Sequence, residues 1–386
     1  MSFTGYYRKN GSVGSRNLIC VMSTVSCAND VALWISQKVK NCVPFLHGQG
    51  CCQTKPDQDM VTRTLISLGR NPNLAGVLLV SLGCESVVAD EVVQGIAEAQ
   101  KPVDKIVIQG VGGAIKALDK GCEIVKVMVK DALQIKREEF PESELVIGVK
   151  CGASDATSGM IANPVTGAAC DILLDQGATC VFGETTEFIG AEHILATRAV
   201  NSRVADKIKT IVESMESRAK SMGVDMRGGQ PTGGNIAAGL TTIEEKSLGA
   251  IAKAGTRNID DVYMYGERIT RKGLFIVDTP GREPEFLTAL GAAGAQVIIF
   301  TTGIGAPHGF PFVPVIKVTG NPNTYRILPD HIDVFTGSPN EKRIDINKLG
   351  QDLYQEVLSV ASGKQTKAEM MGYGKFTNIF SLGPVL

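Results

Sequence analysis

The stretch GVLLVSLGCES, residues 76–86, decides the fold of this chain, because a continuous apolar run leads there into a glycine and a cysteine. An apolar run without polar alternation is typical of a strand buried on both faces of a parallel sheet. Similar short runs cover residues 17–22, 43–46 and 105–109. Strands that alternate with helices predict βαβ units in a parallel, Rossmann-like sheet. The intervening helical patterns cover residues 29–39, 56–68, 87–99 and 113–136.

The strongly charged stretch KREEFPESE, residues 136–144, interrupts this alternation. We interpret it as a domain boundary, although a solvated connector has the same composition. A strand over residues 145–149 opens the second part, where three further apolar runs lead into glycine turns. The sequence thus predicts an α/β protein with an N-terminal domain over residues 1–140 and a larger, glycine-rich C-terminal domain over residues 141–386. Helices of the second part are expected over residues 202–222, 243–254, 283–293 and 346–361.

The composition of the 386 residues excludes several classes of protein. Apolar residues make up 44% and charged residues 20% of the chain, which suffices to bury a core and excludes wholesale disorder. The formal net charge of -1 lacks the basic excess of a nucleic-acid-binding protein. The first residues have no apolar signal region, and no apolar run approaches the roughly 18 residues of a membrane span. We therefore expect a cytoplasmic protein with reduced thiols.

Four of the ten cysteines follow directly on predicted strands. Cys27, Cys51 and Cys84 come after the first three strands, and Cys151 comes after the strand that opens the second part. Ligands of open parallel sheets bind beyond the carboxyl ends of the strands, so these thiols are candidates for one site. Thiolates favour zinc, iron or an iron–sulfur cluster. The alternative, burial as small apolar residues, suits Cys20, Cys42, Cys122, Cys170 and Cys180, whereas Cys52 fits either interpretation.

Polar side chains at the same strand ends are candidates for acid–base chemistry. His47 lies four residues before Cys51, and imidazole is the commonest general base near neutral pH. Lys150, Asp155 and Glu184 also fall just beyond predicted strands. Each has a structural alternative, as a hydrogen-bonded core histidine or as a capping or surface group. For Glu187 we prefer the capping or surface role.

Two glycine-rich loops, over residues 227–239 and 303–309, allow backbone N–H groups to approach a carboxylate or sulfonate. Neither loop matches the dinucleotide-binding fingerprint, and the sequence contains no GxxxxGK[ST] phosphate-binding loop. The nearest match, QGVGG over residues 109–113, is weak, so we do not expect a nucleotide ligand. The residues that we predict to bind the substrate are Asn163, Asn235, Thr241, Thr242, Gly303 and His308.

Six segments occur in the order found in the altronate and galactarate dehydratase family, which the chain resembles from Gly5 to its last residue. They are NGSVGSRN, LHGQGC, SLGCE, CGASDATSGMIANP, GGNIAAGLTTIEEKSLG and TTGIGAPHG. The family also includes the large subunit of sulfolactate sulfo-lyase, and it implies lyase chemistry on a small anionic hydroxy-acid. For the dehydratases the resemblance implies iron. In this chain, Cys27, Cys51 and Cys84 would hold it as Fe²⁺ or as an iron–sulfur cluster, with Cys151 as a fourth candidate.

Single-chain members of the family carry a small β-rich domain ahead of the region seen here. The resemblance therefore implies a large subunit that expects a small partner chain, within an oligomer; a chain that acts alone is the alternative. Two motifs depart from the dehydratases. TTGRGTPYG reads TTGIGAPHG here, so Ile304, Ala306 and His308 replace an arginine, a threonine and a tyrosine. Gln49 replaces the tyrosine of HxYGC. If these loops contact the substrate, the preferred acid should differ as well.

The leading hypothesis is a hydro-lyase that removes water from a sugar acid or a related small hydroxy-carboxylate. The reaction would begin with metal-assisted removal of the proton next to the carboxylate. The first alternative is the large (beta) subunit of a (2R)-sulfolactate sulfo-lyase, which releases sulfite. A noncatalytic metal or redox sensor is a third hypothesis, but it gives no reason for the carboxylates and the glycine loops.

Overall fold

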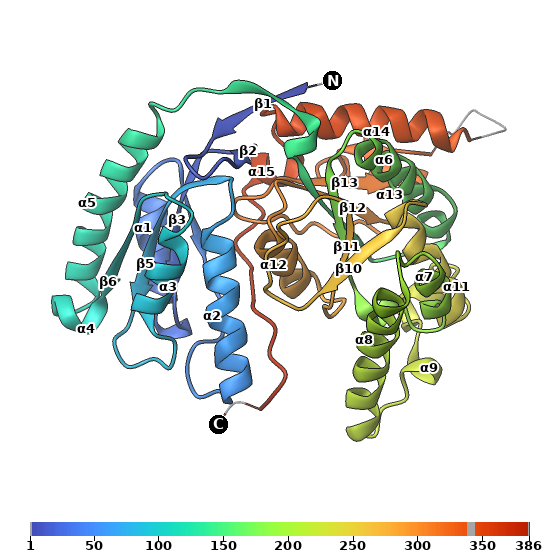
Figure 1. Cartoon of the computed structure of the whole chain (residues 1–386), viewed down its shortest axis with the longest axis horizontal. Helices are drawn as coiled ribbons and strands as arrows, with labels where there is room; N and C mark the ends of the chain where they lie inside the picture. The colour runs from blue at the N-terminus through green and yellow to red at the C-terminus, as the bar shows by residue number, and fades with distance from the viewer. Residues whose placement is uncertain (1, 338–343, 385) are drawn as a thin grey trace.

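The computed structural model describes residues 2–337, 344–384 and 386, and these residues form two lobes with a parallel sheet in each (Figure 1). We define the small lobe as residues 15–135 and the large lobe as residues 142–371. The α/β fold predicted from the sequence is confirmed. No helix in the described part of the chain is long and apolar enough to cross a membrane.

The small lobe contains four parallel strands in the order β4-β3-β5-β6. They are β3 (Leu18–Ser23), β4 (Cys42–Phe45), β5 (Leu74–Ser81) and β6 (Val103–Val107). Strand β5 is buried along its whole length, as its apolar sequence predicts. Two helices cover each face of this sheet. They are α1 (Asn29–Lys38) and α5 (Ala114–Ala132) on one face, and α2 (Lys55–Gly69) and α3 (Ala89–Ala97) on the other.

The described residues of the large lobe form seven parallel strands in the order β10-β11-β9-β8-β12-β13-β14. The central strands are β9 (Thr179–Phe182), β8 (Val146–Gly152) and β12 (Val297–Thr302). The outer strands are β10 (Ile259–Tyr263), β11 (Leu274–Val277), β13 (Val315–Thr319) and β14 (Val334–Phe335). Helix α12 (Glu283–Ala293) packs on the face toward the small lobe. The opposite face is covered by α6 (Asn163–Asp175), α8 (Ser202–Ser221) and α14 (Ile346–Ala361).

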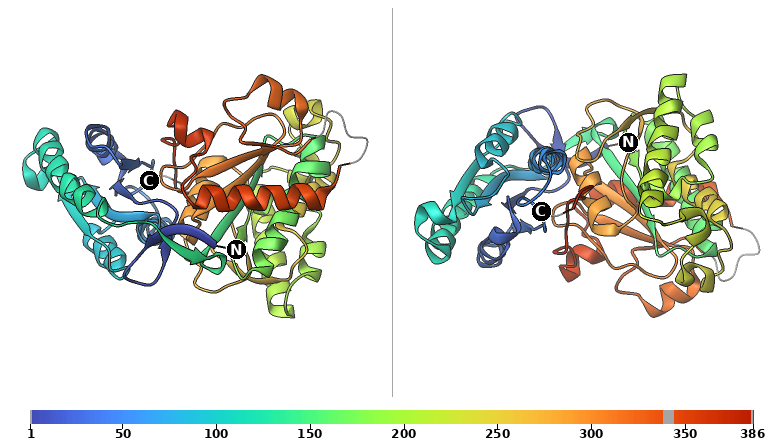
Figure 2. Two further views of the ribbon diagram at one scale, coloured as in Figure 1. Left: turned by 90° about the horizontal axis from the view of Figure 1, so that it is seen from above. Right: turned by 90° about the horizontal axis from the view of Figure 1, so that it is seen from below.

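One apolar core joins the two lobes. Met22 and Leu65 of the small lobe belong to the same buried cluster as Phe286, Leu290 and Phe300 of the large lobe. Helices α2 and α12 lie against each other in this shared core, and the lobes stand side by side when viewed from above and below (Figure 2). Because apolar burial is the main force that holds elements together, the strand ends of the two lobes have a defined relative position.

A third, antiparallel sheet ties the first residues of the chain to the stretch between the lobes. Strand β1 (Ser2–Tyr7) pairs with β2 (Val13–Gly14) on one side and with β7 (Glu138–Pro141) on the other. The charged stretch at residues 136–144 therefore contains strand β7, which we did not predict because the stretch is so rich in charged residues. Arg137 fixes it further, since its guanidinium donates to the carbonyl oxygens of Thr4 and Ser15.

The expected helices agree with the structure best where the apolar pattern is regular. Helices α12 and α14 begin and end at the predicted residues. Helix α6 was not predicted, because its sequence NPVTGAACDILLD contains a proline and a glycine that suggest a loop. Gly167 is needed there for packing, since a Cβ at this position would lie 2.2 Å from the carbonyl oxygen of Ala252.

Candidate active site

Glu184, which follows β9, lies at the centre of a buried network of charges; Lys150 and Cys151 were expected just beyond a strand but lie within the last residues of β8. Glu184 Oε1 accepts a hydrogen bond from Lys150 Nζ at 2.6 Å, and its Oε2 lies 2.9 Å from Lys253 Nζ. The backbone N–H of Cys151 donates to Oε2 at 3.0 Å. The side chains of all three charged residues are fully buried. One carboxylate thus bridges two ammonium groups away from water.

The backbone at Glu184 is held in a conformation that non-glycine residues rarely adopt. Its φ of 72° and ψ of 62° are left-handed. Such a conformation costs about 1–3 kcal/mol and persists only where the surroundings over-determine it, which is common at functional sites. Here the N–H of Glu184 donates to Thr279 Oγ1 at 2.9 Å. The preceding Gly183 is required as well, because a Cβ there would lie 2.6 Å from the carbonyl oxygen of Val277.

The network keeps its lysines charged. Burial alone favours the neutral amine, but the carboxylates of Glu184, Glu283 and Glu187 together outweigh it and raise the pKa of Lys150. Burial also acts to lower the pKa of Lys253, but its contacts with Cys151, Glu184 and Glu187 together raise this pKa above the ordinary lysine value. Both ammonium groups therefore provide fixed positive charge rather than a base. For Glu187 we preferred a capping or surface role, and the surface role is wrong: its side chain is 9% exposed and lies 3.6 Å from Lys253.

Cys151 belongs to this network. Its Sγ, Glu184 and Glu187 place three potential ligand atoms within 4.8 Å of one another, as in a metal site. However, Lys253 Nζ already lies 3.1 Å from Sγ and 2.9 Å from Glu184, so an ammonium group takes the position that a cation would need. The thiol also donates to Glu187 at 2.7 Å, and burial raises its pKa well above the usual range. These contacts engage Cys151 separately from the cysteines of the small lobe.

Cys27, Cys51 and Cys84 lie on three loops of the small lobe that hydrogen bonds hold together. The N–H of Ser26 donates to Gln49 O at 3.0 Å, and the N–H of Ser86 donates to Gly50 O at 3.0 Å. Cys27 and Cys84 are exposed, and Cys51 is half-buried. Among the described residues, the sulfurs of Cys27 and Cys84 form no hydrogen bond, and the three thiols do not form a group as close as that around Cys151.

His47 occupies the same loop as Cys51 but is committed to the fold. Its ring is buried, Nε2 lies 2.9 Å from the carbonyl oxygen of Ser23, and Nδ1 accepts the N–H of Gln49 at 3.2 Å. Burial lowers its pKa to about 4, so the ring is neutral. Because both nitrogens have partners, the geometry favours the structural role over that of a general base.

Both carboxylate oxygens of Asp155 likewise have hydrogen-bond partners within the fold. Its Oδ1 accepts hydrogen bonds from Thr157 and from the N–H and hydroxyl of Ser158, and its Oδ2 accepts one from Asn321 at 2.7 Å. Gly303 packs directly against it, since a Cβ there would lie 2.3 Å from the carboxyl carbon. This pattern matches a carboxylate that caps a turn rather than one that removes a proton from the substrate.

Asn163 and Asn235 lie around the same turn. Asn163 donates to Gly249 O at 2.8 Å and accepts from Thr301 at 2.6 Å. Asn235 donates to Ser154 O at 2.9 Å and accepts from Thr232 at 2.9 Å. Asp155 and Asn163 line a cavity of about 200 Å³ together with Lys246. The structure thus brings predicted residues together here, with their amides already engaged.

Thr241 and Thr242 stabilise the start of α11 (Ile243–Ile251). Thr242 Oγ1 accepts the N–H of Glu245 at 3.2 Å, and the N–H of Thr241 donates to the Glu245 carboxylate at 2.7 Å. His308 differs from these residues. Its Nδ1 is buried and has no hydrogen-bond partner within the described part of the chain. Unlike the asparagine and threonine side chains above, His308 therefore has a polar atom, Nδ1, that forms no hydrogen bond with the described residues.

Three charged residues of this region were not recognised in the sequence. Lys253 completes the network around Glu184. Glu283 has a side chain that is 26% exposed and lies 4.0 Å from Lys150 Nζ. Lys317, on β13, is fully buried and donates to the carbonyl oxygen of His308. The available signal was a lysine within an apolar segment, AIAKAG or VIKVT, because lysine is almost never buried without a partner.

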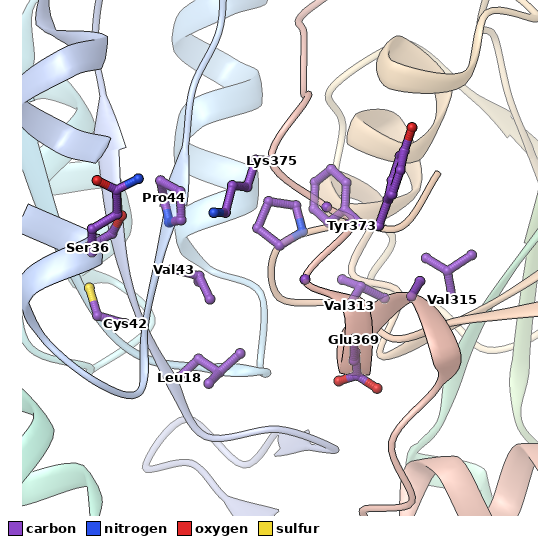
Figure 3. A pocket seen from close by; sticks show the side chains of 16 residues that line it. Leu18, Ser36, Cys42, Val43, Pro44, Val313, Val315, Glu369, Tyr373 and Lys375 are labelled. Carbon is purple, nitrogen blue, oxygen red and sulfur yellow. The ribbon is translucent and has the colours of Figure 1, made fainter. Parts of the chain in front are cut away.

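A groove of about 320 Å³ between the lobes does not carry the site. It is lined by β4 on one side and by residues 310–315 and 368–375 on the other (Figure 3). Its lining is mainly apolar, and Glu369, which faces it, is paired with Arg16 at 2.7 Å. None of the predicted site residues lies in this groove.

Comparison with known proteins places the chain in a family. The model of the D-galactarate dehydratase/altronate hydrolase second domain matches residues 5–133, and that of the D-galactarate/altronate dehydratase C-terminal domain matches residues 142–384. The (2R)-sulfolactate sulfo-lyase subunit beta of Chromohalobacter salexigens is 38% identical over 97% of this chain and 96% of that protein. Altronate dehydratase of Bacillus subtilis and galactarate dehydratase (L-threo-forming) of Escherichia coli are each 34% identical over the whole chain and over 78% and 77% of their own lengths. The chain is therefore a lyase of the D-galactarate and altronate dehydratase family.

Proposed function

We propose that this lyase removes water from a sugar acid or a related small hydroxy-carboxylate. A base takes the proton on the carbon next to the carboxylate, and hydroxide leaves the following carbon with a proton from the site. The resulting enol then tautomerises to a 2-keto acid. The family membership supports an elimination, and the buried network around Glu184 supports its location at the carboxyl ends of β8 and β9.

The observation that carries the proposal is the bridging of two charged lysines by Glu184. Removal of the proton creates negative charge on the substrate carboxylate, and preorganised positive groups in a site that excludes water stabilise such charge. Lys150 is the buried ammonium group that lies next to the partly exposed Glu283, so we propose that its positive charge is the nearest one to the substrate. Glu283 is the carboxylate that we assign as the proton acceptor, because it is partly exposed and lies 4.0 Å from Lys150.

We further propose that Cys27, Cys51 and Cys84 hold iron. Their loops are held together, and the exposed sulfurs of Cys27 and Cys84 have no competing hydrogen bond among the described residues. The thiolates of a cluster bind different irons, so they need not approach as closely as the ligands of a single ion. When bound, iron supplies a Lewis acid for the substrate oxygens. Cys151 is not part of this proposal, because Lys253 and Glu187 engage its thiol.

A second candidate function is the release of sulfite from sulfolactate. The identity of 38% with the sulfo-lyase subunit beta, over nearly the full length of both chains, favours it. The same proton removal would then expel sulfite in place of hydroxide. Because that relative is a subunit, we propose a small partner chain for this protein as well. A cytoplasmic location and an oligomer stay predictions.

An assay of the chain with and without a small partner chain tests both functions. Altronate, galactarate and sulfolactate are supplied in turn to protein purified without oxygen, and 2-keto acid and sulfite are measured. Keto acid without sulfite supports the dehydratase, whereas sulfite supports the second candidate. Glu283→Gln should lower kcat about a hundredfold, and Glu123→Gln, a change of an exposed carboxylate on α5, serves as the control. Metal-linked binding of a partner without any turnover would favour the sensor and contradict the proposal.

A further inference from the structure

An extended segment, residues 373–384, runs between the two lobes, and we call it the strap. It leaves the short helix α15 (Lys367–Met371) at Gly372, whose φ of 67° turns the chain. The strap has no regular secondary structure, and in the view of Figure 1 it runs along the seam where α2 and α12 meet. Its Ile379 is fully buried in the apolar core that the lobes share. Ile379 thus anchors an otherwise largely exposed or half-buried segment in the core that joins the two lobes.

On the small lobe the strap contacts the loop that carries His47 and Cys51. The N–H of Leu46 donates to Thr377 Oγ1 at 3.3 Å, and the Thr377 hydroxyl donates back to Leu46 O. The N–H of Gly48 donates to Asn378 Oδ1 at 3.2 Å. Backbone groups of Leu46 and Gly48 in this loop therefore find their hydrogen-bond partners in the strap.

On the large lobe the strap contacts the loops beside the candidate active site. Tyr373 O accepts the N–H of Gly309 at 2.8 Å, and the Tyr373 ring meets the His308 ring edge to face at 6.1 Å. Further along, the N–H of Phe380 donates to the Tyr265 hydroxyl at 3.2 Å. The strap is therefore bound on both sides by directional contacts.

Asn378 joins the two sets of contacts. Its amide oxygen accepts from Gly48 in the small lobe, and its amide nitrogen donates to Glu285 Oε1 in the large lobe at 2.9 Å. We propose that Asn378 is a positioning residue, through which the strap sets the place of the cysteine-bearing loop relative to the large lobe. The consequence for catalysis rests on the proposed function, in which thiols of one lobe and charges of the other act on one substrate.

Gln49 strengthens the same connection from the opposite side. Its Nε2 donates to Ile379 O at 3.2 Å. Gln49 replaces the tyrosine of the HxYGC motif, one of the two motifs in which this chain departs from the dehydratases. The strap carbonyl gives the glutamine a specific partner, so the loop and the strap are matched to each other in this chain.

Hydrogen exchange of the full chain, followed by mass spectrometry, tests the proposal without substrate or metal. Asn378→Asp keeps the acceptor for Gly48 but loses the donor and places a carboxylate against the buried Glu285. Gln49→Leu removes the second contact without altering the strap. For both variants we expect exchange at residues 46–50 to rise about tenfold, the effect of losing one to two local hydrogen bonds. Residues 83–88, which carry Cys84, should exchange as in the wild type.

Lys375→Ala is the matched control, because Lys375 is an exposed strap residue with no side-chain hydrogen bond or ion pair among the described residues. Its exchange should equal that of the wild type. Unchanged exchange at residues 46–50 in both test variants would overturn the proposal. A uniform rise over the whole chain would also overturn it, because it would show a general loss of stability.

A kinetic measurement then separates positioning from packing. With altronate or sulfolactate as substrate, Asn378→Asp should lower kcat about tenfold while the iron content and KM stay near the wild-type values. If the protein lacks lyase activity, the proposed function fails, and the exchange experiment still decides whether the strap holds the loop. A lower kcat accompanied by a higher KM and a lower iron content, each changed by a similar factor, would contradict a positioning role.

Discussion

The strand ends of the two lobes carry reactive side chains in opposite states. In the small lobe, Cys27 and Cys84 are exposed and have no hydrogen bond at sulfur in the described part of the chain. In the large lobe, Lys150, Glu184 and Lys253 are fully buried, and each charge is compensated. The comparison shows that the strand ends of the small lobe can accept a ligand from solvent. Those of the large lobe already have their charges balanced, and they present a fixed electrostatic field.

Glu184→Gln should have the largest effect on stability, because it breaks the compensated side. Two ammonium groups would remain buried without their shared carboxylate, and loss of one partner from a buried ion pair costs about 3–5 kcal/mol. Urea unfolding at pH 7 measures the change. The matched control is Glu98→Gln, which removes an exposed carboxylate that pairs with Arg70 and should cost less than about 1 kcal/mol. Equal losses in the two variants would show that Glu184 does not balance the buried lysines.

Lys317 sharpens the comparison, since it is a buried amine without a close carboxylate. No described carboxylate lies within 4.0 Å of its Nζ, which faces the Phe300 ring at 5.1 Å. Burial lowers its pKa to about 7; Asp333 and Glu283 oppose this shift, and Lys150 adds to it. His308, whose carbonyl oxygen accepts from Nζ, also faces it.

The lowered pKa predicts how stability depends on pH. Between about pH 7 and the ordinary lysine value of 10.5, the unfolded chain binds a proton that the folded chain does not. Stability from this residue therefore rises as the pH increases through that range and is lowest below pH 7. Lys317→Met should remove this rise and stabilise the protein at pH 6. Unfolding free energies at pH 6, 7.5 and 9 test it; parallel curves for both proteins would contradict the assignment.

Replacing the exposed thiols should have the smallest effect on stability. Serine at Cys27 and Cys84 changes no buried contact, so we expect less than about 0.5 kcal/mol for each. The same changes, combined with Cys51→Ser, should abolish iron binding in protein purified without oxygen. Cys151→Ser is the control and should keep its iron, because Lys253 and Glu187 surround that thiol. Iron retained by the triple variant, or lost from Cys151→Ser, would reverse the assignment.

The sequence predicted the elements whose patterns are local. The apolar run at residues 76–82 predicts β5, and the regular spacing over residues 283–293 and 346–361 predicts α12 and α14 with their observed bounds. Strands β1, β2 and β7 were not predicted, because their pairing depends on residues far apart in the chain. Placing the cysteines at strand ends was also a local inference, and it led to the three connected loops of the small lobe.

The sequence by itself determined the fold class, the family and the strand-end position of most candidate residues. Only the tertiary structure decided which of them are free to act. His47, Asp155 and Asn163 are of suitable types and at suitable positions, yet their polar atoms have partners within the fold. Lys253 and Asn378 were missed for the opposite reason, since each acquires its role from groups that lie more than 60 residues away. Hydrogen bonds and charge pairs depend on distance in space, which the order of residues does not contain.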